Sequence, residues 1–366
     1  MKVLNFINEN QDWEEKIVAS PYFITVKRSD DYILFKYDQL KSDFNNEIVR
    51  ECRGSIFRQE NGVFKCVCAP FYKFGNYGES YVPKIDWNSA LAMDKIDGSL
   101  IKLWYDCGTW HWSTNGTIKA EEANVLTNDN EFMTFYDLIE IALNKDFSFL
   151  NKLNKEFTYM FELVSPYNKV VISYDYTALF FLAARSNKTF KELPLKDLIE
   201  VHKTKLPTCV KFPTYFKCTD ATFLSAVAAN LGKDKEGFVV IDKDFNRAKF
   251  KGQEYLAAAR VRGNGVMKDS TLITLLLEGK EDDLTAYFPE FKERLNSLKT
   301  KLLTLATQME EVWAVASQMK TRKEVAAYVA GSPFAAYIFK RLDHKVESAK
   351  DFIFSLNSKK IVGLIK

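Results

Sequence analysis

The sequence predicts an α+β protein with antiparallel sheets, followed by an all-helical C-terminal domain. Up to about residue 252, short aromatic and β-branched segments such as YILFKY (32–37) alternate with turn residues, which is typical of strands. Beyond that point this pattern disappears, and apolar residues follow a helical spacing. Because 366 residues suffice for two domains, we place one at 1–252 and the other at 253–366.

Strands are predicted at many places in the N-terminal domain. They include the segments 22–28, 32–37, 54–58, 64–74, 99–105, 109–113, 157–164, 169–174 and 178–185. Helices are predicted in 121–144 and 221–232. The segments EGFVVID (236–242) and RAKFKG (247–252) flank a short turn and therefore predict a hairpin.

The clearest helix is predicted in the C-terminal domain. Its apolar residues alternate in steps of three and four: Leu295, Leu298, Leu302, Leu305, Met309, Val312, Ala316 and Met319. This spacing fits either a coiled-coil seam or one helix of a small bundle. We favour the bundle, because amphipathic segments such as 271–279 and 334–342 lie close enough in the sequence to cover the stripe.

The composition is that of a globular protein, with 47% hydrophobic and 27% charged residues. The N-terminus has no secretory h-region, and the run ALFFLAA (178–184) is too short to cross a bilayer. We therefore expect no membrane association and a cytoplasmic location, which would be the infected host's cytoplasm for a phage protein. The six cysteines form no CxxC and the three histidines are scattered, so we expect no structural zinc site.

The charge is distributed unevenly along the chain. From Gln253 onward there are 18 Lys and Arg against 14 Asp and Glu, a net charge of +4, whereas the preceding part carries −1. A positive surface of this size permits a polyanionic partner without requiring one.

Lys95 is the first candidate for chemistry. It lies in the segment DKIDGS (94–99) between two predicted strands, so a rigid edge projects its amine. An amine is nucleophilic only when deprotonated, and an exposed lysine has a pKa near ~10.4. A nucleophilic lysine therefore needs cationic neighbours or desolvation. Alone, a KxDG segment is as easily a surface turn.

Several further segments add charge at strand ends. They are ECRG (51–54), PFYKFGN (70–76), FELVSP (161–166), KEGFVV (235–240) and KFK (249–251). The two lysines of KFK share one face of a strand, and the hairpin would set Lys251 opposite Gly237. Two carboxylates, Glu162 and Glu236, together with several cations suit a nucleotide-phosphate site with a metal ion.

The order KxDG, FExV, EGxxV and KxK resembles the covalent nucleotidyltransferase superfamily of ATP-dependent ligases and mRNA-capping enzymes. ECRG and PxxKFxN are similar to the phage-type single-strand RNA ligases, the RNA ligase 1 branch. The resemblance covers nearly the whole chain. It implies a ligase-type nucleotidyltransferase domain and an ATP-dependent enzyme that joins RNA 5′-phosphate and 3′-hydroxyl ends, through lysine–AMP and adenylylated RNA, in tRNA or RNA repair.

The resemblance also implies a role for each matching residue. Lys95 would take AMP from ATP, Glu162 would hold the ribose, and Glu236 would act near the metal and the α-phosphate. The remaining positions would be Lys249 and Lys251 at the α-phosphate, Arg53 and Lys73 at the other phosphates, Tyr37 as an ATP-site aromatic, Leu182 and Val239 around adenine, and Asp282 as a metal ligand. The metal would be Mg²⁺, with Mn²⁺ as a substitute.

Plainer interpretations stay open for some of these residues. Core packing explains Leu182 and Val239, an ordinary strand position explains Tyr37, and a helix N-terminus explains Asp282. The family commonly has a lysine where this chain has Asn115, twenty residues after Lys95, and Lys119 is a candidate replacement.

Other functions remain as alternatives. Capping-type guanylyltransferases and DNA ligases usually carry an OB-fold-like, strand-rich segment after KFK. Both functions are disfavoured, because no such segment follows KFK in this chain. A non-catalytic RNA-binding protein on a decayed ligase fold is disfavoured by the intact Lys95, Glu162 and Glu236. The expected partners are single-stranded RNA or tRNA ends, with no obligate protein partner evident.

Overall fold

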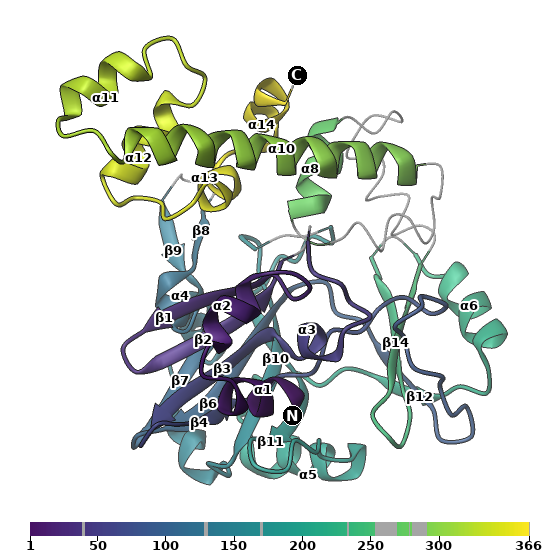
Figure 1. Cartoon of the computed structure of the whole chain (residues 1–366). Helices are drawn as coiled ribbons and strands as arrows, with labels where there is room; N and C mark the ends of the chain where they lie inside the picture. The colour runs from purple at the N-terminus through teal and green to yellow at the C-terminus, as the bar shows by residue number, and fades with distance from the viewer. Residues whose placement is uncertain are drawn as a thin grey trace. The chain divides into compact units, whose positions relative to one another are not determined.

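The computed structural model describes the chain except for residues 39–40, 128–130, 169–170, 233, 253–268, 278, 280–290 and 366. The chain forms two compact units, Met1–Ala259 and Arg260–Lys366 (Figure 1). The domain boundary expected at residue 252 stays a prediction, because residues 253–268 lie outside the described part of the chain.

The first unit contains three four-stranded antiparallel sheets and one two-stranded sheet. The first sheet has the order β1 (Ile24–Ser29), β2 (Tyr32–Tyr37), β3 (Arg53–Glu60), β4 (Val63–Cys68). The second has the order β11 (Ala178–Ser186), β10 (Phe157–Val164), β6 (Ser99–Asp106), β7 (Thr109–Thr114). The third has the order β12 (Tyr215–Lys217), β5 (Leu91–Asp94), β13 (Gly237–Ile241), β14 (Arg247–Lys251). The two-stranded sheet is β8 (Asn124–Leu126) and β9 (Phe132–Thr134).

Helices lie between these strands. They are α1 (Lys2–Glu9), α2 (Trp13–Val18), α3 (Glu47–Glu51), α4 (Phe135–Ala142), α5 (Leu195–Lys205) and α6 (Ala221–Ala229), with short 3₁₀ turns η1 (Ala120–Glu122) and η2 (Ser148–Lys152). The predicted β13–β14 hairpin is confirmed, with Gly237 opposite Lys251. Asp242 fixes its turn, because one carboxylate oxygen accepts the N–H groups of Asp244 at 2.9 Å and Asn246 at 3.0 Å.

Two secondary-structure predictions are wrong, and the strand predicted at 64–74 ends already at Cys68. The segment 121–144, predicted to be helical, forms η1, β8 and β9 before α4 begins. Its residues 127–130, TNDN, are poor helix formers. The segment 169–174 forms no strand in its described part, 171–174. The N–H groups of Val171 and Ile172 instead donate to Asp97 Oδ2, each at 2.7 Å.

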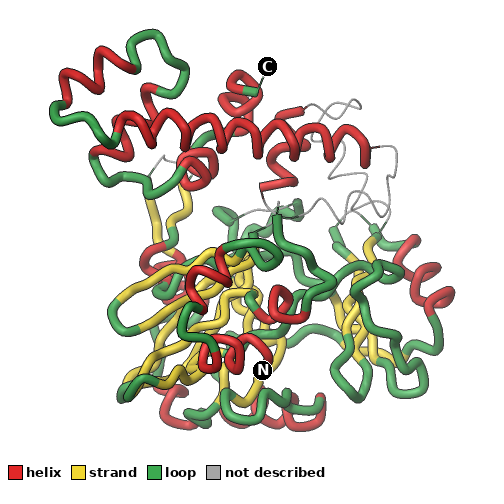
Figure 2. The backbone as a smooth tube through the Cα atoms, viewed as in Figure 1, coloured by secondary structure: helices red, strands yellow, loops and turns green. Residues whose placement is uncertain are grey.

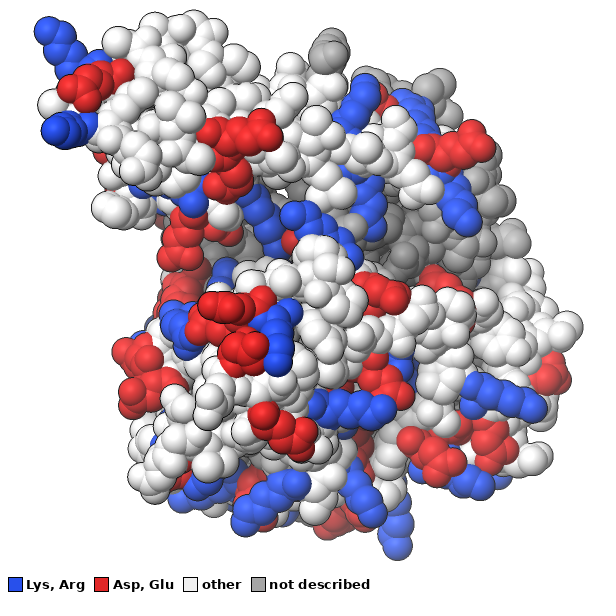
Figure 3. All heavy atoms as spheres, viewed as in Figure 1, with Lys and Arg blue, Asp and Glu red and all other residues white. Residues whose placement is uncertain are grey.

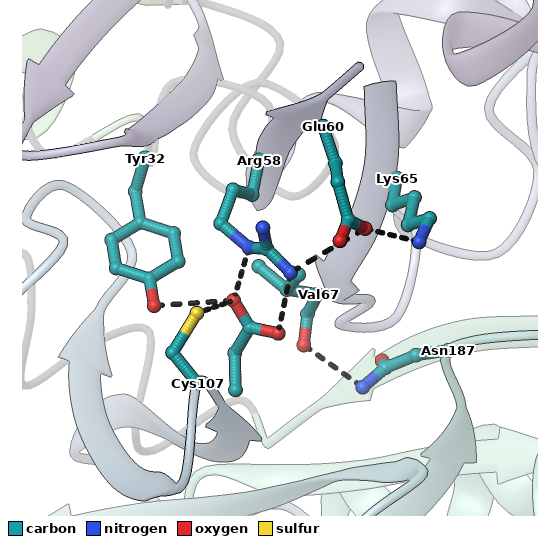
Figure 4. Close-up of polar contacts among 8 residues, drawn as sticks. Tyr32, Arg58, Glu60, Lys65, Val67, Cys107 and Asn187 are labelled. Carbon is teal, nitrogen blue, oxygen red and sulfur yellow. Dashed lines mark hydrogen bonds and ion pairs between the residues drawn. The ribbon is translucent and has the colours of Figure 1, made fainter. Parts of the chain in front are cut away.

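Polar contacts tie the first sheet to the second (Figure 4). Arg58 Nε from β3 donates to Asp106 Oδ2 at the end of β6 at 2.6 Å, and the Tyr32 hydroxyl from β2 donates to the same oxygen at 3.1 Å. Asn187, which follows β11, donates to the Val67 carbonyl of β4 at 2.8 Å. These contacts hold β2, β3 and β4 of the first sheet against β6 and the end of β11 in the second.

The regular elements described in the second unit are all helices (Figure 2). They are α8 (Asp269–Leu277), α10 (Lys292–Ala316), α11 (Arg322–Tyr328), α12 (Ala335–Leu342), α13 (Ala349–Ser355) and α14 (Ser358–Leu364). The predicted stripe of α10 is buried from Leu295 to Met309 and packs against α8, α12 and α13. A bundle within one chain therefore explains the spacing, as predicted. None of the described helices has the length and apolarity of a membrane span.

Candidate active site

Lys95 follows β5, which lies between β12 and β13 in the third sheet. Its N–H donates to the Gly237 carbonyl at 2.9 Å, directly after the registered pair Asp94 and Phe238. The backbone therefore sets the KIDG segment beside the segment that carries Glu236. The register between β5 and β13 is fixed by the alternation of their side chains, because a shift of one residue would turn every side chain of a strand to the other face of the sheet.

Glu236 binds two lysines at once. Its Oε2 lies 2.7 Å from Lys95 Nζ, and its Oε1 lies 2.8 Å from Lys251 Nζ. Burial of Glu236 disfavours its ionised form, but the charges and hydrogen bonds of Lys251 and Lys95 outweigh this effect and lower its pKa to about 2. The structure thus brings together three predicted site residues as an ionised cluster.

Glu162 faces this cluster from β10 of the second sheet. Burial raises its pKa to about 7; the charges of Glu236 and Asp97 also raise it, whereas those of Lys95 and Arg53 lower it. The two predicted carboxylates therefore differ in protonation near neutrality. Glu236 stays ionised, and Glu162 can hold or release a proton.

Gly98 lets the KIDG turn approach β10. A Cβ atom at Gly98 would lie 2.3 Å from the Leu163 carbonyl oxygen and 3.0 Å from Glu162 Cγ, so any side chain would push the two strands apart. Asp97, only 4% exposed, holds the other side of the turn through the N–H groups of Val171 and Ile172. Sequence reasoning gave Asp97 no role, because its partners lie more than seventy residues away.

Arg53 starts β3 with its guanidinium packed against two rings, 5.6 Å from the Phe71 centroid and 5.1 Å from that of Phe74. Its Nε and Nη1 atoms are shielded from solvent and have no hydrogen-bond partner among the described residues. Buried N–H donors without an acceptor are costly, and phosphate oxygens would satisfy them. The arrangement therefore fits a bound phosphate.

Lys73 and Lys249 also lie against aromatic rings. The Lys73 ammonium lies 4.5 Å from the Phe44 ring centroid and 5.6 Å from that of Tyr37. The segment 70–76 runs beside β14, because Lys249 N–H donates to the Gly75 carbonyl at 2.9 Å. Lys249 Nζ consequently lies 5.8 Å from the Phe74 ring centroid.

The two predicted adenine contacts share one apolar cluster. Leu182 on β11 and Val239 on β13 are 8% and 3% exposed, and they pack with Met93, Met160 and Phe71. Core packing accounts for this burial equally well, so contact with adenine stays a prediction.

The remaining predicted residues fare differently. Lys119 is turned to the surface, where its Nζ pairs with Asp30 at 2.7 Å. The idea that it replaces a lysine at Asn115 is therefore unsupported. Asp282 lies outside the described residues. Within the described ranges, no group of three His, Cys, Asp or Glu side chains could hold a metal ion.

Lys102 is a charged residue to which the sequence reasoning assigned no role. It is completely buried in β6 and donates to the Gly54 carbonyl. Burial lowers its pKa to about 8, while Cys68 raises it and Arg53 lowers it further. A signal existed, because strand alternation places Lys102 on the same face as the buried Leu100 and Trp104.

Charged side chains of both signs are interspersed on the face of the first unit drawn in Figure 3. This pattern agrees with the net charge of −1 before Gln253. The cations that matter for a phosphate are thus the partly or fully buried ones around Lys95, and not a broad basic surface on this face.

A family model described as RNA ligase matches residues 51–255, more than half of the chain. An RNA ligase of Rhodothermus phage RM378 is 26% identical over 340 residues, or 78% of this chain and 76% of that protein. A protein of Autographa californica nuclear polyhedrosis virus, whose name proposes polynucleotide kinase and RNA ligase activities, is 31% identical over 283 residues. That match covers 72% of this chain but only 38% of the viral protein.

The fold is similar to that of an archaeal ATP-dependent RNA ligase, with a TM-score of 0.50 and 11% identity over 89% of this chain and 88% of the other. The predicted fold class, a ligase-type nucleotidyltransferase fold with antiparallel sheets and a helical C-terminal part, is confirmed. Because the matched region runs from Glu51 through Lys95 to the end of β14, this chain belongs to the RNA ligase family.

Proposed function

We propose that this chain is an ATP-dependent RNA ligase that seals 5′-phosphate and 3′-hydroxyl ends through AMP carried on Lys95. The observation that carries the proposal is the shared carboxylate of Glu236, 2.7 Å from Lys95 and 2.8 Å from Lys251. Beside it, the buried donors of Arg53 lack a protein acceptor among the described residues. A nucleophilic amine and an unsatisfied anion site thus lie in one unit.

In the first step the Lys95 amine attacks the α-phosphorus of ATP. An N–P bond forms, the bond from phosphorus to the bridging oxygen of the β-phosphate breaks, and pyrophosphate leaves. Lys95 must leave its ion pair and lose a proton before it attacks. Glu162, whose pKa is about 7, is a suitable acceptor, whereas the pKa of about 2 makes Glu236 a poor one.

The next two steps reuse the same groups. A 5′-phosphate oxygen of RNA attacks the phosphorus of the lysine-bound AMP and the N–P bond breaks. The nitrogen takes up a proton, which Glu162 could return, and Lys95 leaves as an amine. An RNA 3′-hydroxyl then attacks that 5′-phosphorus, loses its proton, and AMP departs. Such transfers depend mainly on alignment and charge neutralisation, which Lys249 and Lys251 would provide.

A divalent cation, Mg²⁺ or Mn²⁺, would supply further neutralisation of phosphate charge when bound. Glu236 is the carboxylate beside Lys95 that would lie near it, and Asp282 stays a predicted ligand. Single-stranded RNA or tRNA ends are the proposed substrates, and repair of such ends in the cytoplasm is the proposed setting.

The decisive test is covalent labelling. The protein is incubated with α-labelled ATP and Mg²⁺, denatured, and resolved by electrophoresis. Label should remain on the wild type and on a Lys243→Ala control, which removes an exposed lysine, but not on Lys95→Ala. Label on the Lys95→Ala variant would refute the proposal, and labelling by GTP instead of ATP would indicate capping chemistry.

A further inference from the structure

Asn115 and Gly116 form a turn at the end of β7 that several cations approach. A Cβ atom at Gly54 would lie 2.8 Å from both the Asn115 carbonyl oxygen and Lys102 Nζ. A Cβ atom at Gly116, the residue after Asn115, would lie 3.4 Å from Lys36 Nζ. The Lys36 ammonium, which comes from β2, therefore lies against this turn.

A β-bulge brings Lys36 and Arg53 to the same face. In the β2–β3 ladder Phe35 pairs with Ser55, but Lys36 pairs with Arg53, so Gly54 is the extra residue. Its φ of +77° is the left-handed conformation that glycine adopts at such bulges. Paired residues project from the same side of a sheet, and the bulge thus sets the Lys36 and Arg53 side chains next to each other.

Polar groups around this turn lack protein partners among the described residues. Besides Arg53 Nε and Nη1, the Oδ1 atom of Asn115 is buried without a hydrogen bond. An ammonium has three donors, so the Lys36 ammonium could donate to Asn115 Oδ1 and to an anion held by Arg53.

We infer that Lys36, whose ammonium lies against the turn of Asn115 and Gly116, is a phosphate-binding residue for ATP. The inference rests on the proposed ligase function and adds a residue to its ATP site. Lys36 would supply from β2 a positive charge that Asn115, in the turn after β7, does not have. Because the charge contacts the phosphates of ATP, its loss should affect ATP loading before any step on RNA.

The test compares Lys36→Met with the control Lys119→Met, which removes a surface lysine that pairs with Asp30. Single-turnover labelling of Lys95 over a range of ATP concentrations gives the rate and the apparent affinity. Lys36→Met should lower the second-order rate of labelling about 10- to 100-fold, mainly through weaker ATP binding. Lys119→Met should stay within about 3-fold of the wild type, and Lys36→Arg should retain most of the rate.

The double variant Lys36→Met/Asn115→Lys returns a positive charge to the site from the turn after β7 instead of from β2. It should recover at least half of the loss on a logarithmic scale, and this readout decides the question if Lys36→Met alone does not fold. Wild-type loading by Lys36→Met, or a folded double variant without recovery, would overturn the role of Lys36. A wild type that takes no label would instead refute the ligase proposal itself.

Discussion

The carboxylate of Glu236 lies 2.8 Å from the ammonium of Lys251, and both side chains are only 3% exposed. The β13–β14 ladder enforces this contact, because it places Gly237, the residue after Glu236, opposite Lys251. A charge this deeply buried needs a partner, since water cannot solvate it. Glu236 therefore supports the fold, in addition to the catalytic role proposed for it.

Glu236→Gln should lower the free energy of unfolding by about 3–5 kcal/mol, because it leaves the Lys251 charge buried without its counter-ion. Adding Lys251→Met should restore part of the loss. The control is Glu60→Gln, which breaks the exposed pair with Lys65 and should cost about 1 kcal/mol or less. Urea denaturation measures all of these variants. Equal costs for Glu236→Gln and Glu60→Gln would contradict the prediction.

Glu162 should make stability depend on pH. Folding raises its pKa from 4.5 to about 7, mainly by burial, so the native state binds this proton more tightly than the unfolded chain does. The contribution of Glu162 is therefore most favourable below about pH 4.5, and it declines as the pH rises to about 7. The decline should be at most about 3 kcal/mol.

Glu162→Gln cannot titrate and isolates this effect. Between about pH 4.5 and 7, the free energy of unfolding of the wild type should fall relative to that of the variant. Above about pH 7 the difference between the two should stay constant. Glu156→Gln, which replaces a surface-exposed glutamate, is the control. A difference that is independent of pH would show that Glu162 does not bind its proton in the folded state.

The sequence predicted the part of the site that depends on local alternation. The period of two in EGFVV and KFK, together with a short turn, was enough to place Lys251 opposite Gly237. The contacts of Asp97 with Val171 and Ile172 could not be predicted, because they join segments whose order in space depends on the whole sheet. For the same reason, the bulge at Gly54 that aligns Lys36 with Arg53 leaves no distinct pattern in ECRG.

ATP loading and the later steps should respond to different residues. The resemblance predicts that Arg53 and Lys73 contact the outer phosphates, which leave with pyrophosphate. Arg53→Ala should therefore slow labelling of Lys95 by at least about 10-fold. The Arg53→Ala enzyme should seal pre-adenylylated RNA nearly as fast as the wild type. The Lys251→Ala enzyme should be slow both in labelling from ATP and in sealing pre-adenylylated RNA. Equal failure of Arg53→Ala on pre-adenylylated RNA would remove this division of roles.

The helical unit offers a separate test of substrate choice. The chain from Gln253 onward carries a net charge of +4, and positive charge gives sequence-independent, salt-sensitive affinity for a phosphate backbone. A chain ending at Gly252 retains Lys95, Glu162, Glu236 and Lys251. It should still form the Lys95 adenylate, though more weakly if Asp282 binds metal.

The same truncated enzyme should lose its preference among RNA substrates and show a shallower dependence of RNA binding on salt. Competition between folded and unstructured RNAs at several salt concentrations measures both properties. The excised helical unit should be monomeric in ultracentrifugation, because α8, α12 and α13 already cover the apolar stripe of α10. An unchanged RNA preference would assign substrate choice to the first unit, since it alone would then remain to recognise the RNA. A stable dimer of the excised unit would instead mean that the stripe pairs between chains, and the helices would serve assembly rather than recognition.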